Sequence, residues 1–311
     1  MNGVKPRPQV AQADEAVRTM QSVRDLIRYA VSRLQSAQAS FGHGTDNAWD
    51  EAVWLVLWSL HLPLDRLEPM LDARVAPSEV AATIALIEQR CTERLPLAYL
   101  TGEAWLRGER FLCDARALVP RSPIADLLDS DALEPWLPDA GDIGAVLDLC
   151  TGGASLAILA AHRFGRAHVV GSDLSADALA LAAENIALHR LADRVSLRQG
   201  SLWSPLEGER FDLVLCNPPY VNAASMAELP AEFRHEPVRA LAGGSDGMDL
   251  IRQIVAGAKA HLNPGGLMLL EVGHEASHFE AAFAQLEFIW LPTASGDTSV
   301  ALIERDALPK A

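Results

Sequence analysis

The stretch that decides the fold is Ala145-Val146-Leu147-Asp148-Leu149-Cys150-Thr151-Gly152-Gly153-Ala154. It predicts a short buried strand, then a glycine-containing loop, then an alanine-rich helix over residues 154–164. A second apolar run at residues 168–173 predicts the next strand and ends in Asp173. Strands that alternate with helices are typical of a parallel sheet covered on both faces, in which ligands bind beyond the carboxyl ends of the strands.

The pattern continues to the end of the chain. Ser175 is placed to cap a helix that ends near His189. Further strands are predicted at residues 195–198, 211–216, 266–272, 288–291 and 299–304, with helices between most of them. The last two strands are joined by Gly296-Asp297, which favours an antiparallel hairpin at the end of the sheet.

The first hundred residues predict helices alone. Apolar residues spaced three and four apart predict a helix from Ala16 to Leu34. Asp46 is expected to cap a second helix that runs to Leu60, and Pro77-Ser78-Glu79 opens a third. Residues 105–123 are mixed, with Phe111 and Leu118-Val119 as possible strands. We expect a helical domain over residues 1–115, a connector to about 140, and an α/β domain over residues 141–311.

Composition limits the classes of function. Aspartate and glutamate outnumber lysine and arginine 41 to 26, for a formal charge of −15 over 311 residues. Such a surface repels a phosphate backbone, so direct nucleic-acid binding is not expected, whereas a basic protein partner is attracted. The most apolar stretch, at residues 53–64, is too short to span a bilayer. Residues 1–13 lack the apolar core of a signal peptide, so a soluble cytoplasmic protein without a membrane partner is expected.

The cysteines give no sign of a metal centre. They lie far apart, without a CxxC pair or a nearby histidine at metal-ligand spacing: Cys91, Cys113, Cys150 and Cys216. We therefore expect reduced thiols and no metal site.

Two features suggest a cofactor site. Glycines at 152 and 153 let a ligand approach the backbone N–H groups at the start of a helix. Asp173, 25 residues after Asp148, can accept hydrogen bonds from the ribose hydroxyls of an adenosine-containing cofactor. The loop does not match the G-x-G-x-x-G pattern of dinucleotide sites.

Asn217-Pro218-Pro219-Tyr220 follows the predicted strand at 211–216 directly. The prolines have no N–H and hold the backbone extended, so the carbonyls here are rigid acceptors. Asn217 adds a side-chain carbonyl, and Tyr220 adds a flat ring that can cover a planar group. Acceptors on both N–H bonds of a planar NH₂ group would orient its nitrogen toward a methyl donor. The nucleophile would be an amide or an exocyclic aromatic amine.

These motifs resemble the S-adenosylmethionine-dependent methyltransferases that modify planar nitrogens. Residues 233–237 (Phe-Arg-His-Glu-Pro) and 243–247 (Gly-Gly-Ser-Asp-Gly) resemble the protein N5-glutamine methyltransferases. Residues 42–52 and Leu118-Val119-Pro120-Arg121-Ser122-Pro123 resemble the branch that acts on ribosomal protein L3 of the large subunit. The resemblance implies an enzyme with a Rossmann-like, class I α/β sheet and an N-terminal helical domain for substrate recognition.

The resemblance also implies roles for individual residues. It places the target amide against Asn217, Pro218, Pro219 and Tyr220. It places S-adenosylmethionine against Asp148, Cys150, Thr151, Gly152, Gly153, Asp173, Leu174, Ser201, Leu202 and Asn217. Two positions depart from the family pattern, since Ala154 stands where glycine is usual and Ser201 where an aspartate is usual. Arg121 could line the substrate channel or pair with a carboxylate.

Two alternatives share these motifs. An adenine-N6 nucleic-acid methyltransferase uses the same tetrapeptide on a flipped base, although the acidic composition argues against it. A noncatalytic ribosome-assembly factor could retain the fold, and Ala154 and Ser201 are the departures that keep this reading open.

Overall fold

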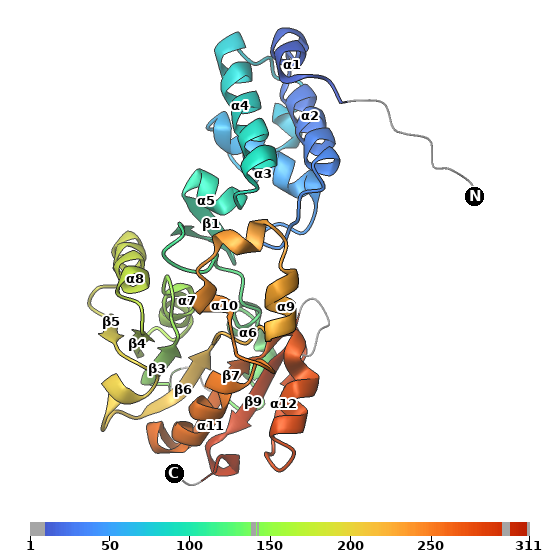
Figure 1. Ribbon diagram of the computed structural model, residues 1–311. Coiled ribbons are helices and arrows are strands. Elements are labelled where there is room, and N and C mark those ends of the chain that lie inside the picture. The colour runs from blue at the N-terminus through green and yellow to red at the C-terminus, as the bar shows by residue number, and fades with distance from the viewer. Residues whose placement is uncertain (1–9, 138–140, 142, 294–298, 310–311) are drawn as a thin grey trace, which may run out of the picture. The chain divides into compact units, whose positions relative to one another are not determined.

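A computed structural model describes residues 10–137, 141, 143–293 and 299–309, and the chain divides into two compact units (Figure 1). The first unit, here called the helical unit, runs to Thr101 and also contains Pro230–His235. The second, the sheet unit, comprises Gly102–Leu229 and the chain from Glu236 onward. The sequence predicts a connector after residue 115, whereas the division between compact units falls at Thr101. In the described part of the chain, no helix is long and apolar enough to cross a membrane.

The helical unit begins with two helices where the sequence predicts one. Its elements are α1 (Ala13–Thr19), α2 (Val23–Ser36), α3 (Ala48–Ser59), η1 (Glu68–Met70), α4 (Pro77–Glu93) and α5 (Leu97–Thr101). The prediction of a single helix from Ala16 to Leu34 is wrong because Ser22 starts a new one. The Ser22 hydroxyl accepts a hydrogen bond from the Asp25 N–H at 3.2 Å, and the Asp25 carboxylate accepts one from the Ser22 N–H at 3.1 Å. This capping box begins α2, after α1 has ended at Thr19.

The cap of α3 is also one residue away from its predicted position. Asn47, not Asp46, precedes the helix, and its side-chain oxygen accepts from the Trp49 and Asp50 N–H groups, both at 3.0 Å. Either side chain could serve chemically, since asparagine and aspartate are equally good caps. The position of the first helical residue decides between them.

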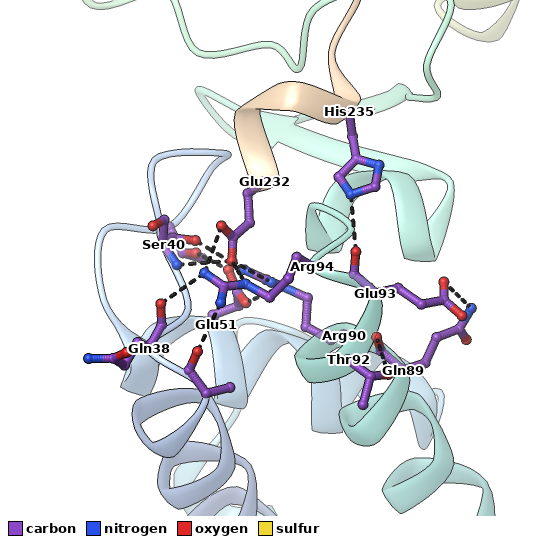
Figure 2. A network of polar contacts seen from close by, with 12 residues as sticks. Gln38, Ser40, Glu51, Gln89, Arg90, Thr92, Glu93, Arg94, Glu232 and His235 are labelled. Atoms are coloured by element: carbon purple, nitrogen blue, oxygen red, sulfur yellow. Dashed lines mark hydrogen bonds and ion pairs between the residues drawn. The ribbon is translucent and has the colours of Figure 1, made fainter. Parts of the chain in front are cut away.

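A buried ion-pair network joins α3, α4 and the segment Pro230–His235 inside the helical unit. Figure 2 shows the Glu232 carboxylate reaching from that segment toward Arg90 and Arg94. Arg90 donates to Glu51 at 2.8 Å and to Glu232 at 3.1 Å, and Arg94 donates to Glu232 at 2.6 Å. The Glu232 side chain is fully buried and Arg90 is 1% exposed. Two positive and two negative charges therefore meet here, so that buried charge is compensated.

The network shifts the titration of Glu232. Burial by itself raises the pKa of this carboxyl group, but hydrogen bonds from Arg94, the Ser40 N–H and Arg90 outweigh it and lower the pKa from 4.5 to about 2. Glu51 shifts in the opposite direction, because burial raises its pKa more than Arg90 and Thr45 lower it. The ionised form of Glu232 is thus strongly tied to the folded state.

The sheet unit is built on seven strands in the order β5-β4-β3-β6-β7-β9-β8. The strands are β3 (Ala145–Leu149), β4 (His168–Asp173), β5 (Val195–Gln199), β6 (Phe211–Cys216), β7 (Leu262–Glu271), β8 (Ile289–Leu291) and β9 (Val300–Glu304). The first five in spatial order are parallel, and β9 pairs antiparallel with both β7 and β8. A separate antiparallel hairpin, β1 (Glu103–Leu106) and β2 (Glu109–Leu112), precedes them.

Helices cover both faces of this sheet. The helices of the sheet unit are α6 (Ile124–Leu128), α7 (Ser155–Arg163), α8 (Ala176–Leu188), α9 (Ala223–Glu228), α10 (Val238–Leu241), α11 (Asp249–His261) and α12 (Ala276–Ala282). Val146 and Leu213 point to the face packed by α6, α7 and α8, whereas Leu147 and Val214 point to the face packed by α11 and α12. Each strand is therefore apolar on both sides, as a parallel sheet requires.

The predicted fold class is confirmed: the sheet is mostly parallel, alternates with helices, and follows an N-terminal helical region. The suggestion of a strand at Leu118-Val119 is wrong, since these residues form an irregular connection. The loop predicted at Gly296-Asp297 lies outside the described residues.

The pKa of Glu232 predicts how stability changes with acid. A pKa lowered from 4.5 to about 2 contributes about 3 kcal/mol to folding above pH 4.5, and this contribution is lost as the pH falls through that range toward 2. We expect Glu232→Gln to lower the free energy of unfolding by about this amount near pH 6, with the deficit shrinking below pH 4.5.

The measurement is denaturant unfolding of the full chain between pH 6 and pH 3. Glu93→Gln is the matched control, because Glu93 is exposed at the end of the same helix that carries Arg90. If Glu232→Gln lowered the free energy of unfolding by the same amount at every pH from 6 to 3, the lowered pKa of Glu232 would be contradicted.

Candidate active site

The candidate site is a cavity of about 810 Å³ in the sheet unit, at the carboxyl ends of the parallel strands. β3 lies between β4 and β6, so the loops that follow these three strands meet at one edge. The cavity is lined by residues from all three loops, including Gly152, Asp173 and Asn217. This is the position at which open α/β sheets bind ligands.

Asp148 shapes the first of these loops from below. Its side chain is 1% exposed, and one carboxylate oxygen accepts from the Thr151 hydroxyl at 2.5 Å and from the Ala157 N–H at 2.9 Å. Burial raises the pKa of Asp148 to about 7, against the effect of these two hydrogen bonds. Asp148 therefore connects the strand, the loop and the first turn of α7.

Asp173 supports the same loop from the neighbouring strand. One of its carboxylate oxygens accepts from the Gly152 N–H at 2.9 Å, and the other accepts from the Ser175 N–H at 2.8 Å. A carboxylate oxygen has more than one acceptor direction, so each can take a further donor from the cavity side. The geometry is compatible with the predicted contact to two hydroxyl groups.

The loop contains two residues other than glycine in the left-handed backbone region. Cys150 has φ of +64° and Ala154, the N-cap of α7, has φ of +65°. A residue with a Cβ at such a position costs about 1–2 kcal/mol relative to glycine. Glycine would avoid this strain at position 154, and the hydrogen bonds of Asp148 and Asp173 hold the loop in its strained form.

Asn217 and Pro219 line the cavity, Pro218 is buried, and Tyr220 turns toward the sheet. The Tyr220 hydroxyl donates to Glu271 at 2.9 Å. The tetrapeptide thus contributes Asn217 and Pro219 to the cavity wall, and the hydrogen bond of Tyr220 to Glu271 anchors its last residue to the sheet.

Glu271 accepts the hydrogen bond from Tyr220, and the sequence analysis did not single it out. It ends β7, is 4% exposed, and accepts from the Ser122 hydroxyl at 2.5 Å as well as from Tyr220. Burial raises the pKa of Glu271 to about 7, while the hydrogen bonds from Ser122 and Tyr220 and the charge of Arg121 act to lower it. A glutamate at the last position of an apolar strand is the signal that could have found it.

Three glycines leave room for Tyr220. A Cβ added to Gly243 or Gly247 would lie 2.7 Å or 2.2 Å from the Tyr220 backbone, and one added to Gly273 would lie 2.3 Å from its ring. The chain after Tyr220 is also bonded to this region, because Val221 N–H donates to the Leu241 carbonyl at 2.8 Å. The Gly-Gly-Ser-Asp-Gly motif at 243–247 therefore shapes the backbone around the tetrapeptide.

Arg121 is the residue for which the sequence analysis left two roles open. It lines the cavity, and it forms a two-point ion pair with Glu236 at 2.5 and 2.7 Å. The Glu236 side chain is fully buried and also accepts from the Val119 N–H at 3.1 Å. The irregular connection at 118–122 is thereby fixed along one wall of the cavity.

The cavity gathers most of the residues that the sequence analysis proposed. Those that line it are Asp148, Cys150, Thr151, Gly152, Gly153, Asp173, Leu174, Ser201, Leu202, Asn217 and Pro219. Pro218 and Tyr220 are not among the lining residues. The individual roles given to all of these residues stay predictions.

Comparisons with known proteins find one matching family model and relatives that are similar to this chain over most of its length. Residues 128–246 match the family model described as the methyltransferase small domain. The ribosomal protein uL3 glutamine methyltransferase of Bordetella pertussis is 57% identical over 289 residues, covering 93% of this chain and 97% of its own. The protein of the same name from Burkholderia pseudomallei is 55% identical over 295 residues, covering 93% and 96%.

Among solved structures, the chain is similar to a methyltransferase from Pyrococcus furiosus. It is 20% identical, covers 64% of this chain and 89% of its own, and has a TM-score of 0.46.

The glycine contacts predict a specific steric defect. Gly247→Ala would force a Cβ against the Tyr220 carbonyl, in addition to the strain of φ at +80°. Gly265→Ala is the matched control, because Gly265 has φ of +76° and nothing within 4 Å of the added Cβ. We expect Gly265→Ala to cost about 1–2 kcal/mol and Gly247→Ala a further 1–3 kcal/mol.

Free energies of unfolding from denaturant titration give both values. If the two variants were equally destabilised, Tyr220 would have room to move and the packing role of the motif would be wrong.

Proposed function

The chain belongs to the family of ribosomal protein uL3 glutamine methyltransferases, and from this premise we propose that it methylates a glutamine side-chain amide of ribosomal protein uL3. The reaction is a direct transfer of the methyl group from S-adenosylmethionine to the amide nitrogen: the sulfur–methyl bond breaks as the nitrogen–methyl bond forms, S-adenosylhomocysteine leaves, and the nitrogen releases one proton to solvent. The observation that carries the proposal is the convergence of the 148–154 loop, Asp173 and Asn217 on one cavity.

The residues of the cavity fit S-adenosylmethionine. Its volume of about 810 Å³ falls within the range of sites for molecules of this size. Asp173 can accept the ribose hydroxyls, and Gly152 and Gly153 let the methionine part approach the loop. Ser201 and Leu202 also line the cavity, and we assign the adenine base to them, with the neutral Ser201 hydroxyl as acceptor. When bound, S-adenosylmethionine supplies a methyl group activated by its sulfonium charge.

We assign the target amide to Asn217 and Pro218. An amide nitrogen is a poor nucleophile because its lone pair is delocalised into the carbonyl group. The Asn217 side-chain oxygen and the Pro218 carbonyl would accept its two N–H bonds, aim the nitrogen and favour release of the lone pair as the new bond forms. Pro219 cannot donate a competing N–H, and Glu271 holds Tyr220 so that the turn keeps its shape.

Charge favours a protein substrate over a nucleic acid. Among the described residues, three arginines line the cavity, and two of them are neutralised within the sheet unit, since Arg116 pairs with Asp114 and Glu184 and Arg121 pairs with Glu236. The third is Arg239. With a net charge of −15, the chain attracts a basic ribosomal protein and repels phosphate groups. The adenine-N6 alternative is therefore disfavoured, and we expect no direct nucleic-acid contact.

We propose that the helical unit recognises the protein substrate. All residues that line the cavity belong to the sheet unit, which leaves the helical unit free of the proposed chemistry. Because ribosomal proteins are made in the cytoplasm, we place the reaction there.

The function is tested by methyl transfer to purified uL3. The full chain is incubated with labelled S-adenosylmethionine and uL3, with ribosomal RNA as a parallel substrate, and mass spectrometry locates the methyl group. We expect one methylated glutamine on uL3 and no labelled RNA. Label on adenine would support the alternative enzyme, and absence of any transfer would support a noncatalytic protein.

Asn217→Ala tests the amide clamp. Losing one preorganised acceptor costs about a hundredfold to a thousandfold in turnover, while the affinity for S-adenosylmethionine should change little. Asn217→Asp keeps an acceptor but adds a charge, so it should bind the cofactor and still transfer slowly. Single-turnover transfer within about threefold of wild type for Asn217→Ala, or about 0.65 kcal/mol, would remove Asn217 from the reaction.

Asp173→Ala separates cofactor binding from chemistry. It removes hydrogen bonds to two ribose hydroxyls, each worth about 1.5–3 kcal/mol, and the acceptor that steadies Gly152. We expect calorimetry to show at least a tenfold loss of S-adenosylmethionine affinity in a variant that stays folded. Unchanged affinity would exclude Asp173 from the cofactor site.

A further inference from the structure

Three potential metal ligands from separate elements meet on the sheet unit, away from the candidate active site. They are Glu109 of β2, His162 of α7 and His189, the C-cap of α8. Each offers one ligand atom, and these atoms all lie within 4.8 Å of one another. None of the three lines the cavity described above.

The separations match those of ligands on one zinc ion. His162 Nε2 lies 3.4 Å from His189 Nδ1, and His189 Nδ1 lies 3.6 Å from a Glu109 carboxylate oxygen. Two ligands bonded at about 2.0–2.1 Å to a tetrahedral Zn²⁺ are about 3.4 Å apart. Only small movements of His162, which is exposed, and Glu109, which is 43% exposed, are needed to complete the site.

One hydrogen bond decides which ring nitrogen of the central histidine faces the other two ligands as an acceptor. His189 Nε2 lies 2.9 Å from the Arg110 carbonyl, which can only accept, so that nitrogen carries the proton. In the neutral ring, the lone pair therefore lies on Nδ1, which is the atom that faces His162 and Glu109. Metal-bound histidines are usually oriented by such a hydrogen bond from the second ring nitrogen. The His189 side chain is also 8% exposed and packs beside Phe111, which restricts its rotation.

The donor set selects the kind of metal. Two imidazoles and one carboxylate suit Zn²⁺ and related transition metals, whereas Mg²⁺ and Ca²⁺ prefer oxygen ligands. Two neutral rings and one carboxylate around a divalent ion leave a single positive charge, which the acidic chain accommodates readily. The nearby Arg110 guanidinium is directed to Glu103 at 3.5 Å.

We propose that Glu109, His162 and His189 form a zinc-binding site with water as the fourth ligand. The ion would link the β1–β2 hairpin to the C-terminal ends of α7 and α8. The first turns of these two helices, at their opposite ends, contribute Ser155 and Asp177 to the cavity. The proposal is independent of methyl transfer, because its residues neither line the cavity nor contact Asn217.

Calorimetric titration of the chelator-treated full chain with Zn²⁺ alone tests the site. We expect one equivalent to bind at neutral pH. His162→Gln should weaken binding by more than about a hundredfold, since losing an outer partner alone costs about 10- to 100-fold. Glu109→Gln should weaken it in the same direction. His61→Gln is the matched control, because His61 is exposed and lies in the helical unit.

Co²⁺ provides a second readout that reports coordination directly. The wild-type protein should develop the visible absorption of four- or five-coordinate Co²⁺, and His162→Gln should not. Both variants change exposed or half-exposed side chains, and circular dichroism checks that they stay folded. The proposal fails if wild type binds no Zn²⁺, or if His162→Gln and Glu109→Gln bind it as well as wild type and His61→Gln do.

Discussion

The Asp148 carboxylate is the constraint on which the rest of the site depends. It is buried at the end of the central part of the sheet, where β3 pairs with β4 on one side and β6 on the other. A carboxylate in that position is costly unless donors satisfy it, and Thr151 and Ala157 do so by folding the loop back over the strand end. Asp173, at the end of the adjacent strand, accepts a hydrogen bond from the Gly152 N–H. Hydrogen bonds to these two carboxylates stabilise a loop whose backbone is strained at Cys150 and Ala154. The loop therefore has its shape without a bound ligand.

The second half of the site follows a different physical principle, which is exclusion of side chains. Tyr220 is held by one hydrogen bond to Glu271, but its backbone is confined because Gly243 and Gly247 approach it too closely for any Cβ. Pro218 and Pro219 have no backbone N–H that could donate to the neighbouring carbonyl groups. Gly243 and Gly247 have no side chain that would displace Tyr220. These two effects fix the backbone around the tetrapeptide, and they support the proposal that Asn217 and Pro218 act as preorganised acceptors for the target amide.

Much of this could be read from the sequence, and the exceptions have clear causes. The strands 145–149, 168–173 and 211–216 were predicted with their observed bounds, because apolar runs followed by turns leave little choice. The loop and tetrapeptide follow these strands directly, so the sheet alone brings them together. The helix break before Ser22 was missed because the apolar spacing continues across it, although the capping box was present. Glu271, the Arg90–Glu232 network and the Glu109–His162–His189 cluster depend on residues far apart in sequence, which no local pattern reveals.

The Phe-Arg-His-Glu-Pro motif at 233–237 has a structural explanation that bears on the division of labour. Glu232, just before it, is buried among arginines of the helical unit, whereas Glu236, within it, is buried against Arg121 and Val119 in the sheet unit. The chain thus carries two charged anchors four residues apart, and each is satisfied in a different unit. Deleting residues 1–101 would leave Glu232 without Arg90 and Arg94, and the segment that carries Glu232 comes after α9, which itself follows the tetrapeptide. Such a truncation would therefore disturb more than the substrate recognition that we propose for the helical unit, and surface substitutions on its helices are the cleaner way to test that proposal.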